Sequence, residues 1–167
     1  MEGSQLQRLV EVMDQLRSPG GCPWDAEQTH ESLLKYLLEE SYEFVDAVQS
    51  GNRIDMREEL GDVLLQVYFH ARIAQDDLDD PFTIEDVAQS IADKLIRRHP
   101  HVFSDAAAQS TAEVVHNWEA IKKLEKGRTS ALDGVAMSQP ALALIEKLLY
   151  RASKFDVDVV VPKVVDL

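Results

Sequence analysis

The chain has 167 residues, of which 45% are hydrophobic and 28% charged, and its formal net charge is −13 at pH 7. This length suits one domain with a buried core better than two domains. The composition is typical of a soluble globular protein, and no apolar run approaches the roughly 20 residues that cross a bilayer. The acidic excess argues against nucleic-acid binding, which depends on Lys and Arg to neutralise phosphates.

The N-terminus and the cysteine content favour a cytoplasmic protein without membrane partners. Residues 1–5 have neither the basic nor the apolar region of a secretory signal. Cys22 is the single cysteine, so the chain cannot form an intramolecular disulfide, which fits a reducing compartment.

Apolar residues recur at helical spacing in the first half of the chain. A first amphipathic helix is predicted over residues 6–16, followed by a break at 18–21 and an irregular stretch at 22–25. A second helix is predicted at about 31–50 and a third at about 55–75. Gly51 and Asn52 form the turn between them.

The second half of the chain continues the helical pattern. Thr83 and Asp86 predict the start of a fourth helix, which ends before residue 100. Ser110 and Glu113 resemble a capping box for a fifth helix that ends before residue 127. A sixth apolar segment is expected at 140–149, and residues 155–161 form a strand or an unstructured end. Without strand–helix alternation or a Gly-rich phosphate loop, the predicted fold is an all-α helical bundle.

Two pairs of acidic residues are placed symmetrically about Gly51. Glu40 and Glu43 are three residues apart on the second helix, and Glu59 and Asp62 are three apart on the third. Residues at this spacing share a helix face. In an antiparallel hairpin Glu43 lies level with Glu59, and Glu40 lies level with Asp62. The spacing therefore predicts four converging carboxylates.

These acids can also be ordinary solvated surface residues, since the chain has 30 Asp and Glu residues. Two observations favour a metal site instead. Between residues 60 and 74 the only formal charges are Asp62 and Arg72, and Asp62 falls between Phe69 and Ile73 on a helical wheel. Partly buried carboxylates need cations, and oxygen ligands suit hard divalent ions, Mg²⁺ first and Mn²⁺ second.

The acidic pattern resembles the MazG-type nucleoside triphosphate pyrophosphohydrolases. Residues 39–43 followed by 59–62 match the family pattern EExxE…ExxD. The resemblance extends to residues 21–25 upstream and to 93–103 and 118–122 downstream, and it covers roughly residues 5–150. The EExxE…ExxD pattern alone is only moderately specific, whereas the full series in this order is strong.

The resemblance implies Mg²⁺-dependent hydrolysis of nucleoside triphosphates between the α- and β-phosphates, which gives a monophosphate and pyrophosphate. It assigns the metal to Glu40, Glu43, Glu59 and Asp62. Either Glu39 or Glu43 could accept the proton of the attacking water. Narrower dUTP or dCTP pyrophosphatases with the same metal chemistry are an alternative. So is a non-catalytic helical interaction module with a vestigial metal site.

Basic residues near the end of the fourth helix are candidate phosphate ligands. Lys94, Arg97 and Arg98 form the densest basic cluster of the chain. Cations also favour helix C-termini for purely structural reasons, so spacing alone leaves both interpretations open. The resemblance favours Lys94 and Arg98 as triphosphate ligands, together with Lys122.

Two tryptophans are candidate platforms for a nucleobase. Trp24 and Trp118 each offer a flat aromatic face, although a lone tryptophan is more often simply packed in a core. Cys22 is interpreted as structural. The five histidines lack the spacing of a zinc site and receive no role.

Longer members of the resembled family carry two copies of the carboxylate hairpin, and this sequence contains one. We therefore expect a homodimer or higher homo-oligomer that completes the bundle. Residues 1–127 are predicted to form the MazG-like domain, and residues 128–167 a linker, a short helix and an unassigned tail.

Overall fold

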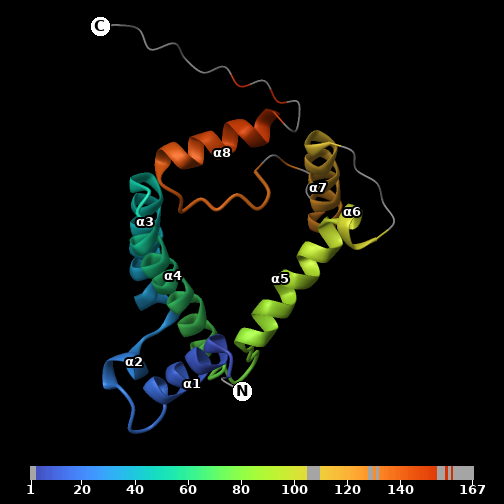
Figure 1. Cartoon of the computed structure of the whole chain (residues 1–167). Helices are drawn as coiled ribbons and strands as arrows, with labels where there is room; N and C mark the ends of the chain where they lie inside the picture. Colours follow the sequence, from blue (N-terminus) through green and yellow to red (C-terminus); the bar gives the residue numbers. More distant parts are fainter. Residues whose placement is uncertain are drawn as a thin grey trace, which may run out of the picture. The chain divides into compact units, whose positions relative to one another are not determined.

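The computed structural model describes residues 3–104, 110–127, 130, 132–153, 157 and 159, without the side chains of 116, 119, 123 and 126 (Figure 1). Within these ranges every regular element is a helix, which confirms the all-α prediction. The helices are α1 Gln5–Arg17, α2 Pro23–Glu27, α3 His30–Ser50, α4 Arg53–Ala74, α5 Ile84–Arg98, α6 Pro100–Phe103, α7 Thr111–Lys126 and α8 Ala141–Ser153.

The two longest helices, α3 and α4, pack against each other as an antiparallel hairpin (Figure 1). At the start of α3, the Thr29 hydroxyl accepts a hydrogen bond from the Ser32 amide, and the Ser32 hydroxyl accepts one from the Thr29 amide. Gly51 ends α3 with a φ of 70°, a left-handed conformation that glycine adopts without strain. Asn52 then caps α4 by accepting a hydrogen bond from the Ile54 amide at 3.0 Å. The predicted turn is confirmed.

The hydrophobic core lies toward the open end of this hairpin, away from Gly51. Its buried members come from α1, α3 and α4, and they are Met13, Leu33, Tyr68 and Phe69. Leu9 and Leu16 of α1 pack against this cluster. The half of the hairpin that is nearer the turn has fewer buried side chains, which leaves room there for polar groups with access to solvent.

Ion pairs join α1 to α4 beside this core. Arg72 donates to Asp14 of α1 at 2.9 Å and to Asp76, in the loop after α4, at 2.7 Å. Arg17 of α1 lies 3.5 Å from the same Asp76 carboxylate. Because these acids are half-exposed, the pairs contribute more to the register of the helices than to stability.

The described residues divide into two compact units, Met1–Lys94 and Leu95–Leu167, and the division falls within α5. In the first unit, Thr83 and Asp86 form the expected cap of α5, because each accepts a hydrogen bond from the other's amide. In the second, Ser110 accepts from the Glu113 amide and so caps α7, and Gly127 ends that helix. The predicted domain boundary at residue 127 stays a prediction.

Two short helices differ from the sequence prediction. The stretch at 22–25, expected to be irregular, lies mostly within α2 at 23–27, and residues 100–103, for which no helix was predicted, form α6. Each begins at a proline, whose fixed φ suits the first position of a helix. A single helical turn is too short to show apolar periodicity, which explains the omission. Most of the proposed strand at 155–161 lies outside the described residues.

None of the described helices is both long and apolar enough to span a bilayer.

Candidate active site

Three carboxylates converge between α3 and α4, on the half of the hairpin nearer the turn. Glu40 and Glu43 come from α3 and Glu59 from α4, and each offers one oxygen within 4.8 Å of the others. Glu40 and Glu59 are half-buried, whereas Glu43 is exposed. The i, i+3 spacing on α3 and the antiparallel register bring these groups to one small volume.

Asp62 lies beside this cluster and is half-buried, but it is not one of the three residues within 4.8 Å. Partial burial raises the pKa of Glu40, and the nearby charges of Asp62, Glu43, Glu59 and Glu39 raise it further. Partial burial likewise raises the pKa of Glu59, with Glu43 as the strongest charged neighbour and Asp62 the next. Among the charged neighbours of Glu40, Asp62 raises its pKa most. Among those of Glu59, Glu43 raises its pKa most. The symmetric register about Gly51 implies the same pairs.

No Lys or Arg in the described part of the chain forms an ion pair with these carboxylates. No cation of the described residues thus compensates their mutual repulsion, which is unfavourable unless a cation binds. A compact set of carboxylate oxygens with access to water matches the preferences of Mg²⁺ and Mn²⁺. The donor set therefore fits a hard divalent cation held by Glu40, Glu43 and Glu59, with Asp62 adjacent.

Glu39 is exposed on α3 and lies at the edge of the cluster. Its charge is the weakest of those that raise the pKa of Glu40. Glu39 is not one of the three residues whose oxygens lie within 4.8 Å of one another.

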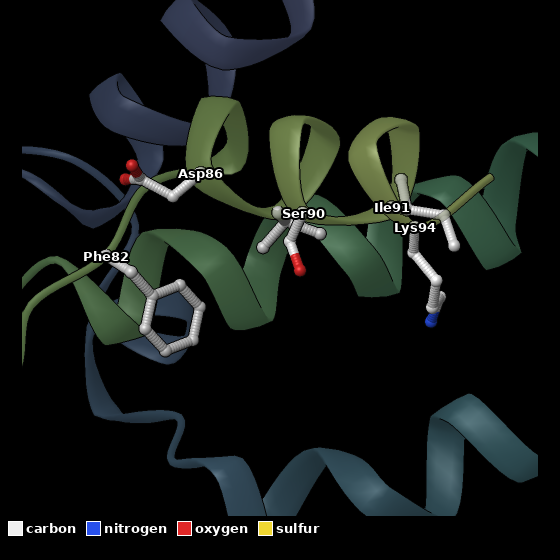
Figure 2. A pocket seen from close by; sticks show the side chains of 6 residues that line it. Phe82, Asp86, Ser90, Ile91 and Lys94 are labelled. Atoms are coloured by element: carbon white, nitrogen blue, oxygen red, sulfur yellow. The ribbon is translucent and has the colours of Figure 1, made fainter. Parts of the chain in front are cut away.

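Lys94 lines an open pocket of about 420 Å³ along α5. The other lining residues are Phe82, Asp86, Val87, Ser90 and Ile91. Figure 2 shows Phe82 near one end and Lys94 near the other, with both side chains directed to the same side of α5. Lys94 forms no ion pair with any described residue, so its ammonium group is available to an anion.

The two arginines of the predicted phosphate clamp have a protein partner. Arg98 donates to Glu125 of α7 at 2.9 and 2.6 Å, and Arg97 donates to the other oxygen of the same carboxylate. Arg98 is buried, with 8% of its surface exposed. Hydrogen bonds from both guanidinium groups lower the pKa of Glu125 to about 2. Phosphate binding by these arginines would require them to leave Glu125.

Trp24 lies on α2 and packs edge-on against two aromatic rings of the core. Its ring centroid is 5.9 Å from that of Tyr36 and 6.4 Å from that of Phe69. It is still 49% exposed. The packed and the base-stacking interpretations of Trp24 are thus compatible, because only part of the indole is covered.

Trp118 and Lys122 lie one turn apart on α7, in the second unit. The Trp118 ring contacts His99 at a centroid distance of 5.4 Å and is 37% exposed. Of the predicted site residues, the carboxylates, Trp24 and Lys94 belong to the first unit. Arg97, Arg98, Trp118 and Lys122 belong to the second.

Sequence reasoning missed two polar groupings. Glu125 joins Arg97 and Arg98 across nearly thirty residues, and His30 of α3 meets His70 of α4 at 2.8 Å between their Nδ1 atoms. Helical periodicity links residues on one helix but gives no pairing between helices. The register about Gly51, which places residues 30 and 70 at similar distances from the turn, was a usable signal for the histidine pair.

Comparison with known proteins identifies the hairpin. The model of the MazG nucleotide pyrophosphohydrolase domain matches residues 28–103, which include all four carboxylates, Lys94, Arg97 and Arg98. The crystal structure of a mazG-related protein from Thermotoga maritima is similar, with a TM-score of 0.58 and 31% identity. The alignment covers 70% of this chain and 98% of that chain. The chain belongs to the MazG family.

Curated MazG relatives are longer than this chain. A nucleoside triphosphate pyrophosphohydrolase of Mycobacterium tuberculosis is 51% identical, over 91% of this chain and 46% of its own length. The nucleoside triphosphate pyrophosphohydrolase/pyrophosphatase MazG of Thermotoga maritima is 47% identical, over 93% of this chain and 60% of its own length. The Escherichia coli nucleoside triphosphate pyrophosphohydrolase is 43% identical, over the same shares. The chain thus spans about half to three-fifths of these relatives.

Proposed function

We propose that this chain is a Mg²⁺-dependent nucleoside triphosphate pyrophosphohydrolase. It hydrolyses the bond between the α- and β-phosphates and releases a nucleoside monophosphate and pyrophosphate. The observation that carries the proposal is the convergence of three carboxylate oxygens within 4.8 Å, from two helices, with no ion pair to a Lys or Arg among the described residues. MazG membership and the names of the relatives support the same activity.

The carboxylates on α3 and α4 have separate roles in this proposal. Glu40, Glu43 and Glu59 hold the divalent cation, and Asp62 adds negative charge from the next turn of α4. When bound, such a cation supplies positive charge beside the phosphates and makes a nearby water molecule more acidic. Glu39 or Glu43, both exposed, accepts the proton of the attacking water.

The triphosphate needs cationic side chains of the protein as well, because the chain carries a net charge of −13. Lys94 is available for this role, since no described carboxylate pairs with it. Arg97 and Arg98 contribute if a phosphate group replaces the Glu125 carboxylate, and Lys122 lies on the same helix as Glu125. Trp24 and Trp118 are the candidate contacts for the base.

A homodimer is part of the proposal, because α3 exposes a continuous apolar stripe. Large apolar side chains that are between 44% and 57% exposed recur at helical spacing along four turns, namely Leu34, Leu38, Tyr42, Val45 and Val48. At 100° per residue this stripe lies away from the face that carries Glu40 and Glu43. A second copy can cover the stripe and leave the carboxylates accessible.

The direct test is pyrophosphate release from a panel of ribo- and deoxynucleoside triphosphates, with Mg²⁺ or with EDTA. We expect pyrophosphate and the matching monophosphate in equal amounts, only when the metal is present. Activity confined to dUTP or dCTP would support the narrower pyrophosphatase. Stoichiometric release of orthophosphate would contradict cleavage between the α- and β-phosphates. No hydrolysis of any nucleotide by the well-folded chain would contradict the catalytic proposal.

A further inference from the structure

His30 and His70 meet at the open end of the α3–α4 hairpin. His30 is the first residue of α3, and His70 lies in the second half of α4. Their Nδ1 atoms are 2.8 Å apart. The hairpin is therefore closed by the Gly51 turn at one end and joined by two imidazole rings near the other, with the carboxylate cluster between them.

The two rings lie edge to edge in one plane. Their planes differ by only 2°, and their centroids are 5.1 Å apart. The centroid separation exceeds the Nδ1···Nδ1 separation by about twice the centre-to-vertex distance of an imidazole ring. Both nitrogens therefore lie close to the line between the centroids. This is the geometry of an in-line N–H···N hydrogen bond and not of face-to-face stacking.

A proton fits between these nitrogens, and a metal ion does not. Metal–nitrogen bonds are about 2.0–2.1 Å, so two in-line nitrogens on one ion would lie about 4 Å apart. The observed 2.8 Å is too short for that arrangement and normal for a hydrogen bond. One ring must donate Nδ1–H, and the other must accept at an unprotonated Nδ1.

The burial of His70 decides how this pair takes up protons. Its Nε2 atom is buried without a hydrogen-bond partner among the described residues, whereas His30 is exposed. The favoured neutral form has His70 donating from Nδ1, which leaves its buried Nε2 without a hydrogen. If one proton is added while the bond persists, both Nε2 atoms must carry hydrogen. A buried donor without an acceptor is then created.

The surroundings disfavour a positive charge on His70. Burial lowers the pKa of His70, and the charge of His30 lowers it further. Glu31, beside His30 on α3, has a pKa lowered by its own backbone amide, then by the Thr29 hydroxyl and by His30. The amides of Asp80 and Asp79 lower the pKa of Asp77, in the loop after α4, and His30 contributes to the same shift. Both carboxylates thus attract a protonated His30.

The arginines at this end of the hairpin are already engaged with acids. Arg17 of α1 pairs with Asp76, and Arg72 of α4 pairs with Asp14 and Asp76. Among the side chains named at this end of the hairpin, only histidine is of a residue type whose ordinary pKa lies between neutral pH and mild acid.

We propose that His30 and His70 act as a proton-controlled clamp, which holds the open end of the α3–α4 hairpin together near neutral pH and releases it in mild acid. A shared proton joins the helices in the neutral pair. Further protonation creates either a buried unpaired donor or two opposed N–H groups, and both favour separation. The pair is thereby a positioning element for the carboxylates that α3 and α4 carry, and this last link rests on the proposed function.

The linkage between protons and stability has a definite sign. Since the pKa of His70 is lowered in the folded state, the unfolded chain binds more protons in mild acid. The stabilisation by the pair is present above the unfolded histidine pKa of about 6.5 and is lost as the pH falls through the folded value. Uptake of one extra proton on unfolding changes the folding equilibrium constant by at most about tenfold per pH unit.

The first test is denaturant unfolding of the full chain between about pH 8 and pH 5. The double variant His30→Gln/His70→Gln removes the titrating pair and keeps side chains that form hydrogen bonds. The matched control is His99→Gln/His101→Gln, because those rings also adjoin, at 5.6 Å and with planes tilted by 57°. We expect wild type and control to lose stability below about pH 6.5, and the His30/His70 variant to lose clearly less. Identical profiles for all three proteins would overturn the clamp.

The second test needs no variant and remains decisive if the double substitution prevents folding. Nitrogen-15 NMR of the histidine rings in the wild-type chain should show one Nδ1 protonated and the other bare at neutral pH. The two signals should then titrate as a coupled pair. Two rings that titrate independently near about pH 6.5 would contradict a shared proton.

The activity readout separates the clamp from the proposed function. If the chain hydrolyses nucleotides, the acid limb of the pH–rate profile should move in the His30/His70 variant and stay in the control. If the acid limb of the pH–rate profile does not move in the His30/His70 variant, the histidine pair does not position the carboxylates. If no nucleotide is hydrolysed at any pH, the proposed function fails, and the unfolding and NMR results still decide the clamp.

Discussion

At the scale of single residues, the roles of charged side chains follow from their partners in the folded chain. Glu40 and Glu59 are half-buried with other acids as neighbours, and burial and mutual repulsion raise the pKa of both. Glu125 is likewise an acid, but two arginines hold its pKa at about 2. The first two form no ion pair with a described Lys or Arg, whereas Glu125 pairs with Arg97 and Arg98. Sequence spacing alone does not separate these cases.

Near-isosteric neutralisation of the carboxylates should abolish turnover without loss of the fold. Glu43→Gln and Asp62→Asn each remove one of several repelling charges, so we expect unchanged or slightly higher stability and at least a hundredfold lower kcat, about 2.7 kcal/mol in the barrier. The control is Asp46→Asn, one turn further along α3, which removes an exposed acid outside the cluster. Pyrophosphate release and thermal melting measure both effects. A variant that keeps more than about a tenth of wild-type kcat would remove that residue from the site.

At the scale of elements, the sequence predicts the long helices well because their signals are local. The caps at Thr83 and Ser110 and the Gly51–Asn52 turn lie where they were expected. The short helices α2 and α6 escaped prediction, since one turn carries no periodicity. The register about Gly51 also predicts that acids from α3 and α4 meet, which the Glu40, Glu43 and Glu59 cluster confirms.

Contacts between elements that are distant in the sequence cannot be predicted from hydrophobic periodicity. The Arg98–Glu125 pair joins residues 27 positions apart, and the His30–His70 pair joins residues 40 apart. Each depends on the rotation of two helices about their axes, which single-sequence patterns constrain loosely. The engagement of Arg97 and Arg98 with Glu125 is likewise visible only in the folded chain.

A divalent cation should stabilise the hairpin, because it relieves repulsion between acids on α3 and on α4. We expect a higher melting temperature in millimolar Mg²⁺ or Mn²⁺ than in EDTA, with a stabilisation of about 2.7 kcal/mol at a hundredfold excess over Kd. Calorimetry provides the measurement. The double variant Glu43→Gln/Glu59→Gln should lose most of the shift, whereas Asp46→Asn should keep it. Equal melting temperatures of the wild-type chain in EDTA and in Mg²⁺ would count against a metal site.

At the scale of the whole molecule, the net charge and the exposed apolar surface have opposite effects on self-association. The net charge of −13 makes copies of the chain repel each other, whereas the apolar stripe from Leu34 to Val48 favours burial against another surface. The longer relatives extend well beyond the aligned region, since the chain spans 46% to 60% of them. In the proposed homodimer, a second copy of this chain covers the stripe.

The stripe should be required for dimerisation in solution. Leu38 lies within it and is 57% exposed, so Leu38→Glu places a charge in the expected interface and should convert the dimer to a monomer. Leu6→Glu is the matched control, because Leu6 is 55% exposed on α1, outside the stripe. Sedimentation at one fixed protein concentration measures the outcome. If wild type and Leu38→Glu sediment alike, either as monomers or as dimers, the stripe is not the interface.

Mixing two inactive variants distinguishes an active site shared between copies from one built within a single chain. Asp62→Asn damages the carboxylate cluster, and Lys94→Ala removes the one predicted phosphate ligand of the first unit. If each site combines the acids of one copy with Lys94 of the other, a heterodimer keeps one intact site and the mixture regains part of the activity. If each chain supplies its own Lys94, both sites of the heterodimer are damaged and the mixture stays inactive. Recovery that disappears when Leu38→Glu is added to both variants would tie the shared site to the α3 stripe.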